Sequence, residues 1–167
     1  MFPPGSIGFA HSTGALGRLI RLGEWMRFRK GSKYNHVFVI DRLRDGKCYV
    51  VQATLRGVTD SATLGEIAPG GSYTIVKLPP DVNRAKVLEF ARRQVGLRYG
   101  YMTILAIALD IVTWDWVPAF RGARKQSWIC SALGAESLRY GGWLHDWISI
   151  YDMTPAQLFV ALSDQGS

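Results

Sequence analysis

Residues 127–133 read SWICSAL, and our prediction of the fold starts from this stretch. Ser127 is a favoured helix N-cap residue, and Gly141 and Gly142 are typical of a helix end, so a helix is predicted between them. Cys130 then lies in the first turn, where unpaired N–H groups and the helix dipole stabilise an anion. A cysteine in this position loses its proton readily and becomes a nucleophile. The alternative is that Cys130 is a small buried core residue.

Residues 34–54 give the clearest prediction of β-structure. The β-branched and aromatic run within 34–41 is typical of a strand, and a partner strand is predicted over 47–54. The sequence Asp45-Gly46 between them is a strong signal for a hairpin turn. Because side chains alternate along a strand, we expect His36 and Gln52 to project on one side, near the same end of the hairpin.

The rest of the chain predicts a few more strands and several helices. A short strand or extended segment is expected at 7–10, a loop over 55–71 and a third strand over 72–78. Helices are expected over 15–27, from Asp81 or Asn83 to Val95, over 102–112, and after Thr154. This order predicts an α+β fold, a small antiparallel sheet packed by helices, in a single domain spanning residues 1–167.

Composition limits the partners and cofactors. The chain has 167 residues, a net charge of +7, two cysteines and three histidines. These Cys and His residues have no close metal-ligand spacing, so neither a metal nor another cofactor is expected. Basic residues gather in 18–33 and 121–125, which suits an anionic polymer such as cell wall, a membrane surface or nucleic acid, although a solvated basic face is an equal alternative. No specific nucleic-acid motif is present.

The N-terminal residues lack the basic segment and apolar stretch of a signal peptide. Segment 102–112 is shorter than the roughly 20 residues of a membrane span, and Asp110 interrupts it. We therefore expect cytoplasmic synthesis without a signal peptide, followed by virion association or release by a non-Sec route if the protein acts outside the cell.

Three residues form a candidate catalytic group. A thiol nucleophile needs a base to take its proton, and the base needs a polar residue to orient it. Cys130 at a helix start, His36 at a strand start and Gln52 on the neighbouring strand meet these needs. Cys48 has no helix terminus beside it and is expected to be inert.

Five short motifs resemble those of one enzyme family, the circularly permuted NlpC/P60 domains of papain-like, YiiX/YaeF type. The matching stretches are SKYNHVFVI (32–40) with VVQA (50–53), VGLRYGY (95–101), WICSAL (128–133), TPAQL (154–158) and the opening IGF (7–9). The resemblance spans nearly the whole chain in the permuted order.

This resemblance implies a papain-like fold with Cys130 as nucleophile, His36 as base and Gln52 in the orienting position. It also places Tyr34 and Tyr99 beside the substrate. Three positions depart from the family pattern. Gln52 stands where Glu is common, Tyr99 is followed by Gly where Asp is usual, and Ser6 stands where Asp is usual in the opening motif.

The favoured function is hydrolysis of amide bonds by a cysteine peptidase or amidase, and cell-wall peptides are the usual substrates of the wider family. A first alternative is a lipid acyltransferase that uses the same Cys130 and His36, with segment 102–112 holding an acyl chain. A second alternative is a catalytically inactive structural or binding module of a larger assembly, such as a phage particle.

Overall fold

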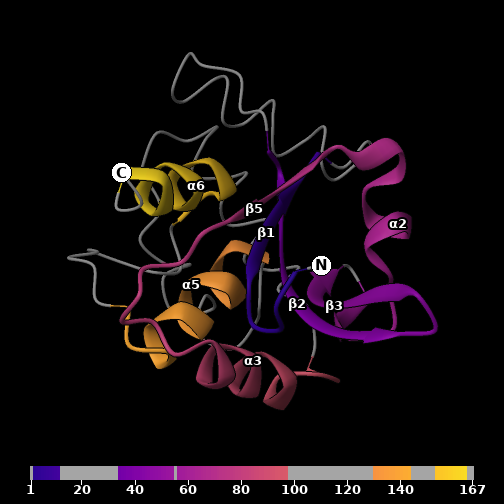
Figure 1. The fold of residues 1–167 in the computed structure, drawn as a ribbon, viewed down its shortest axis with the longest axis horizontal. Helices are drawn as coiled ribbons and strands as arrows, with labels where there is room; N and C mark the ends of the chain where they lie inside the picture. The colour runs from indigo at the N-terminus through magenta and orange to yellow at the C-terminus, as the bar shows by residue number, and fades with distance from the viewer. Residues whose placement is uncertain (1, 12–33, 55, 98–129, 144–152, 165–167) are drawn as a thin grey trace, which may run out of the picture.

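The computed structural model describes residues 2–11, 34–54, 56–97, 130–143 and 153–164. These form a mixed α+β fold around a five-stranded antiparallel sheet with strand order β4-β3-β2-β1-β5. The strands are β1 (Ile7–Ala10), β2 (His36–Arg44), β3 (Lys47–Thr54), β4 (Gly57–Thr59) and β5 (Tyr73–Val76). The helices are α2 (Leu64–Ile67), the 3₁₀ turn η1 (Pro69–Gly71), α3 (Arg84–Arg93), α5 (Cys130–Tyr140) and α6 (Pro155–Asp164) (Figure 1). The predicted helices over 15–27 and 102–112 lie outside the described residues.

The hairpin between β2 and β3 confirms the prediction from Asp45-Gly46. Both residues have positive φ, 52° at Asp45 and 71° at Gly46, as a two-residue turn of this kind requires. The bounds of β3 match the prediction, whereas β2 continues past residue 41 to Arg44. Near Asp41 the pairing of the two strands shifts by one residue, which marks a β-bulge.

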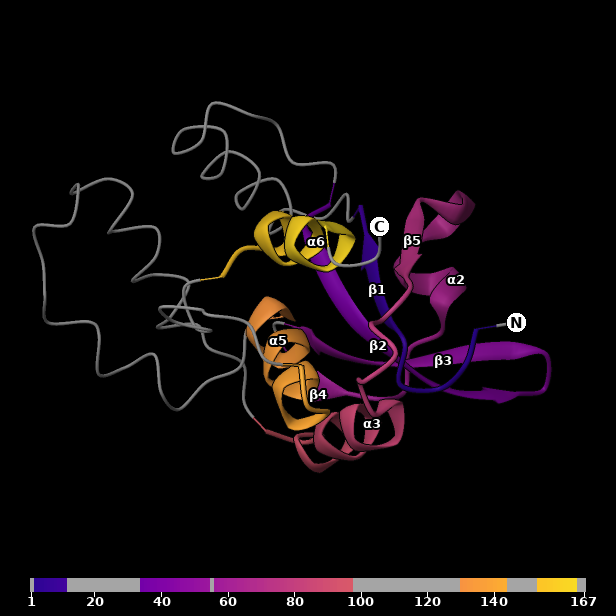
Figure 2. The ribbon, with the colours of Figure 1, turned by 60° about the vertical axis from the view of Figure 1, so that its left-hand side comes forward.

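The two faces of the sheet pack against different helices. Alternate β2 residues such as Val37 and Val39 face the main core, which also contains side chains from α3, α5 and α6. Phe38 and Ile40 face a smaller cluster, to which α2 contributes Leu64. Figure 2 shows α3, α5 and α6 stacked on one side of the sheet and α2 on the other.

The prediction that residues 55–71 form a loop is wrong. β4 extends the sheet by pairing with β3, and α2 follows it. Thr63 and Glu66 form a capping box at the start of α2, in which the Thr63 N–H donates to Glu66 Oε2 at 2.7 Å. Leu64 is buried against the sheet, and Ile67 and Ala68 pack in the same cluster, so both a local cap and apolar contacts hold this short helix.

The starts of α3 and α6 agree with the predicted caps. The Asn83 side chain accepts a hydrogen bond from the Lys86 N–H at 3.1 Å, which caps α3. At α6, the Gln157 N–H donates to the Thr154 hydroxyl, and the Thr154 N–H donates to Gln157 Oε1. Among the described residues, no helix has the length and apolar character needed to cross a membrane.

Candidate functional site

His36 and Gln52 face each other across β2 and β3, as predicted. The His36 Nε2 atom lies 2.6 Å from Gln52 Oε1. An amide oxygen can only accept, so Nε2 carries the proton and donates it. In the neutral ring this leaves a lone pair on Nδ1, and Nδ1 makes no hydrogen bond to any described residue. Gln52 therefore fixes the tautomer in which Nδ1 can accept a proton.

The surroundings of His36 favour the neutral imidazole. Burial lowers the pKa of His36 below its usual value, and the hydrogen bond to Gln52 offsets part of this effect. A histidine with a lowered pKa is unprotonated at neutral pH, which is the state a general base requires.

Cys130 is the first residue of α5 and lies in the main core, with 4% of its surface exposed. The helix approaches β2 closely one turn later, at Gly134. A Cβ atom at Gly134 would lie only 2.8 Å from Val37 Cγ1, so the absence of a side chain permits this contact. The predicted cap residue Ser127 lies outside the described residues.

The other end of α5 is attached further along β2. Asn83, just before α3, donates its N–H to the carbonyl of Gly141 at 2.8 Å. Arg84 lies directly against Gly5, where a Cβ would be 2.1 Å from the Arg84 carbonyl oxygen. Gly5 in turn donates its N–H to the Ile40 carbonyl at 2.8 Å. The end of α5 is thus linked to the part of β2 that contains Ile40.

Together these contacts give α5 a direction along β2. Gly134 contacts Val37, and the helix then runs toward the level of Ile40. Cys130 precedes Gly134 by about one turn. It therefore lies toward the beginning of β2, the end at which His36 is located.

The imidazole and the thiol belong to opposite faces of the sheet. Cross-strand pairing of Phe38 with Gln52 puts the Gln52 side chain on the Phe38 face, and His36 projects on this face too. The helix that carries Cys130 packs on the opposite face. A reaction between the two groups must therefore take place around the end of the sheet where β2 begins. Catalytic hydrogen bonds often tighten only when substrate is bound.

Tyr34 lies in the core just before β2. Its ring packs against Phe159 of α6, with centroids 4.7 Å apart, and its hydroxyl lies 2.6 Å from Thr74 Oγ1 of β5. Only 5% of its surface is exposed, so Tyr34 supports the chain that leads into His36. Tyr99, the other residue predicted beside the substrate, lies outside the described residues.

Cys48 provides an internal reference thiol. It is partly buried on β3, and burial together with the negative charge of Asp41 raises its pKa. A raised pKa reduces the thiolate population at neutral pH, in agreement with the expectation that Cys48 is inert.

Sequence reasoning missed Asp41, a buried carboxylate in β2. It forms ion pairs with Arg42 beside it and with Arg92 of α3. The sequence signal is an acidic residue directly after an apolar run, which predicts the end of the strand at this position. Within the described ranges, no group of three or more His, Cys, Asp or Glu side chains is placed to hold a metal ion. The predicted basic segments 18–33 and 121–125 lie outside these ranges.

Comparison with known proteins does not identify a family. The sequence matches no family model, and searches of curated proteins and of solved structures found no significant match. The described fold is α+β with a small antiparallel sheet, while the papain-like permuted arrangement stays a proposal.

Proposed function

We propose that this protein is a cysteine-dependent amide hydrolase, with Cys130 as nucleophile, His36 as general base and Gln52 as the orienting residue. The observation that carries the proposal is the hydrogen bond from His36 Nε2 to Gln52. This hydrogen bond leaves Nδ1 of His36 as the proton acceptor. His36 lies at the beginning of β2, and the N-terminal end of α5 lies toward the same end of the sheet.

In the proposed reaction, Nδ1 of His36 takes the proton from the Cys130 thiol. The thiolate attacks the amide carbonyl, and backbone N–H groups at the start of α5 stabilise the oxyanion. The His36 imidazolium then gives its proton to the leaving amine, and a thioester remains on Cys130. His36 then takes a proton from water as the water attacks the thioester, and it returns this proton to the departing sulfur, which releases the acid and restores the thiol. Gln52 accepts the Nε2 hydrogen bond throughout.

The proposed substrates are cell-wall peptides or related amides. This choice rests on the resemblance to permuted NlpC/P60 domains, and the net charge of +7 suits an anionic wall polymer. Gln52 contributes no charge, so the imidazolium is less stabilised than it is beside a carboxylate.

A second candidate is a binding module without catalytic activity. The burial of Cys130 in the main core favours it, because a buried cysteine commonly acts as a small apolar residue. The two candidates differ in the ionisation of the thiol, which can be measured directly.

The test is the alkylation rate of each cysteine between about pH 5 and pH 9, with iodoacetamide as the reagent and peptide mass spectrometry as the readout. We expect Cys130 to be alkylated well below the usual thiol pKa of about 8.5, because neutral His36 accepts its proton as the sulfur reacts, and Cys48 to react only at higher pH. His36→Ala should remove the low-pH reactivity of Cys130, and His11→Ala is the matched histidine control. An unreactive Cys130 in the parent protein would support the binding module.

Activity on muropeptides then tests the substrate class. We expect His36→Ala to reduce the hydrolysis rate by about 10²–10⁴-fold, the usual contribution of a general base. Acyl lipids serve as the competing substrate, because activity on them alone would point to an acyltransferase.

A further inference from the structure

The β2–β3 ladder has two registers, one on each side of Asp41. On the turn side the pairs are Arg44–Lys47, Leu43–Cys48 and Arg42–Tyr49. On the other side they are Ile40–Val50, Val39–Val51 and Phe38–Gln52. Asp41 is the extra residue between them, so it forms a β-bulge on β2.

This shift decides which face of the sheet Gln52 occupies. If the turn-side register continued without a bulge, Gln52 would pair with Val39, whose side chain faces the main core. His36 would then lie on the opposite face, because a one-residue change of register moves side chains across the sheet. The bulge instead pairs Gln52 with Phe38 and brings it within 2.6 Å of His36.

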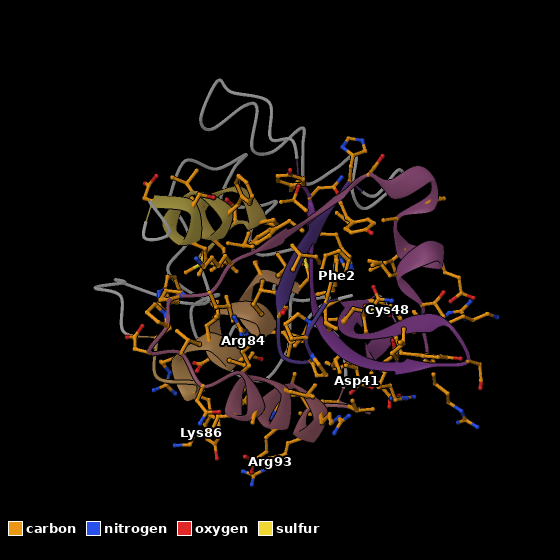
Figure 3. All side chains as sticks on the ribbon, viewed as in Figure 1. Phe2, Asp41, Cys48, Arg84, Lys86 and Arg93 are labelled. Carbon is orange, nitrogen blue, oxygen red and sulfur yellow. The ribbon has the colours of Figure 1, made fainter. Side chains whose placement is uncertain are left out.

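The bulge is held in place by ion pairs from two directions. Asp41 has a fully buried side chain, and its Oδ1 accepts a hydrogen bond from Arg92 Nε of α3 at 2.6 Å. Its other oxygen contacts Arg42, which also donates to Asp60 at 3.2 Å. Figure 3 shows Asp41 between the sheet and α3. The carboxylate therefore attaches the irregular part of β2 to a neighbouring helix.

We propose that Asp41 is a positioning residue. It forms the bulge, its ion pair with Arg92 holds the bulge in place, and the bulge sets the register in which His36 meets Gln52. This effect on register follows from the strand pairing alone. Its importance for catalysis rests on the proposed function, in which Gln52 fixes the tautomer of His36. An ordinary stabilising ion pair would change the unfolding free energy and leave the imidazole unchanged.

The test follows the Nε2–H proton of His36 by NMR in the full chain. Asp41→Asn and Arg92→Gln each weaken the ion pair between these two residues, one from the acidic side and one from the basic side. Arg93→Gln is the matched control on α3. Arg93 pairs with Glu89 of its own helix, so it does not hold the bulge. We expect solvent exchange of the Nε2–H proton to accelerate about tenfold or more in the first two variants, since the protecting hydrogen bond opens more often. The control should stay within about twofold of the parent.

Folded Asp41→Asn and Arg92→Gln proteins with parental exchange of this proton would overturn the proposal. Arg92→Gln keeps the test valid if Asp41→Asn does not fold. The Arg92 side chain is 52% exposed, and its replacement leaves Asp41 in contact with Arg42.

Cysteine alkylation separates this proposal from the proposed function. If Cys130 of the parent titrates as an ordinary thiol, the hydrolase proposal fails, while the exchange of the His36 proton still decides the role of Asp41. If Cys130 of the parent is alkylated at low pH, we expect Arg92→Gln to lower its rate near pH 6 and Arg93→Gln to leave it unchanged.

Discussion

The two faces of the sheet differ in how they are covered and in the chemistry they carry. The main face is packed by α3, α5 and α6 and contains Cys130 within a large apolar core. The other face has a smaller cluster under α2, and it carries His36, Gln52 and Cys48. We therefore expect the apolar packing on the main face to contribute most of the free energy of unfolding. The polar residues of the candidate site lie on the other face.

This difference shows why the candidate site must form at an end of the sheet. Neither face contains both the thiol and the imidazole, and β2 is the strand that connects them through Val37 and His36. Substitutions on the main face should alter the free energy of unfolding, whereas substitutions near Gln52 should alter the ionisation of His36.

Matched leucine substitutions give the largest expected contrast in stability. Leu138 of α5 is completely buried in the main core, and Leu64 of α2 is 7% exposed in the smaller cluster. We expect Leu138→Ala to lower the free energy of unfolding by about 3–5 kcal/mol, because the dense surroundings cannot collapse onto the cavity. Leu64→Ala should lower it by about 1–3 kcal/mol, since the four-residue α2 can relax. Urea unfolding measures both, and equal losses would contradict the assignment of stability to the main face.

Matched glycine substitutions test the close packing of α5 on β2. In Gly134→Ala the new Cβ meets Val37 at 2.8 Å and Leu158 of α6 at 3.4 Å. We expect a net destabilisation of about 1–2 kcal/mol, because the strain of overpacking exceeds the gain in helix propensity. Gly65→Ala on α2 meets nothing within 4 Å, so it should stabilise the protein by about 0.4–1 kcal/mol. The comparison is made by thermal unfolding, and a stabilising Gly134→Ala would mean that α5 does not pack tightly on β2.

Local signals in the sequence predicted much of the sheet. Asp45-Gly46 fixed the hairpin, and Asn83 and Thr154 predicted helix starts that the structure confirms. The bulge could not be predicted, because it depends on an ion pair between Asp41 and Arg92, 51 residues apart. Alternation along each strand predicted that His36 and Gln52 share a face, but counting back from the turn without the bulge puts them on opposite faces.

The direction of α5 along β2 could not be predicted from the sequence either, because it depends on contacts between distant segments. In the sequence, Gly134 is an ordinary small residue of a predicted helix. The structure shows that Val37 occupies the space a side chain at Gly134 would fill. The predicted residues of the candidate site were therefore easier to identify than the packing that orients them.

The smallest expected effect is the pH dependence that His36 gives to stability. Its pKa is lowered in the folded protein, so the unfolded chain binds more protons below about pH 6.5. Stability should therefore fall as the pH drops below that value, by no more than about 1.4 kcal/mol per pH unit for this single group. In Gln52→Glu a carboxylate faces Nε2 and raises the pKa of His36, which favours the protonated ring in the folded state. The His36 contribution should then reverse, present below about pH 6.5 and lost as the pH rises through the new pKa. Urea unfolding of both proteins between about pH 5 and pH 8, with His36→Gln as the reference for other groups, measures this contribution. The same slope in the parent and in Gln52→Glu would show that Gln52 does not control the ionisation of His36.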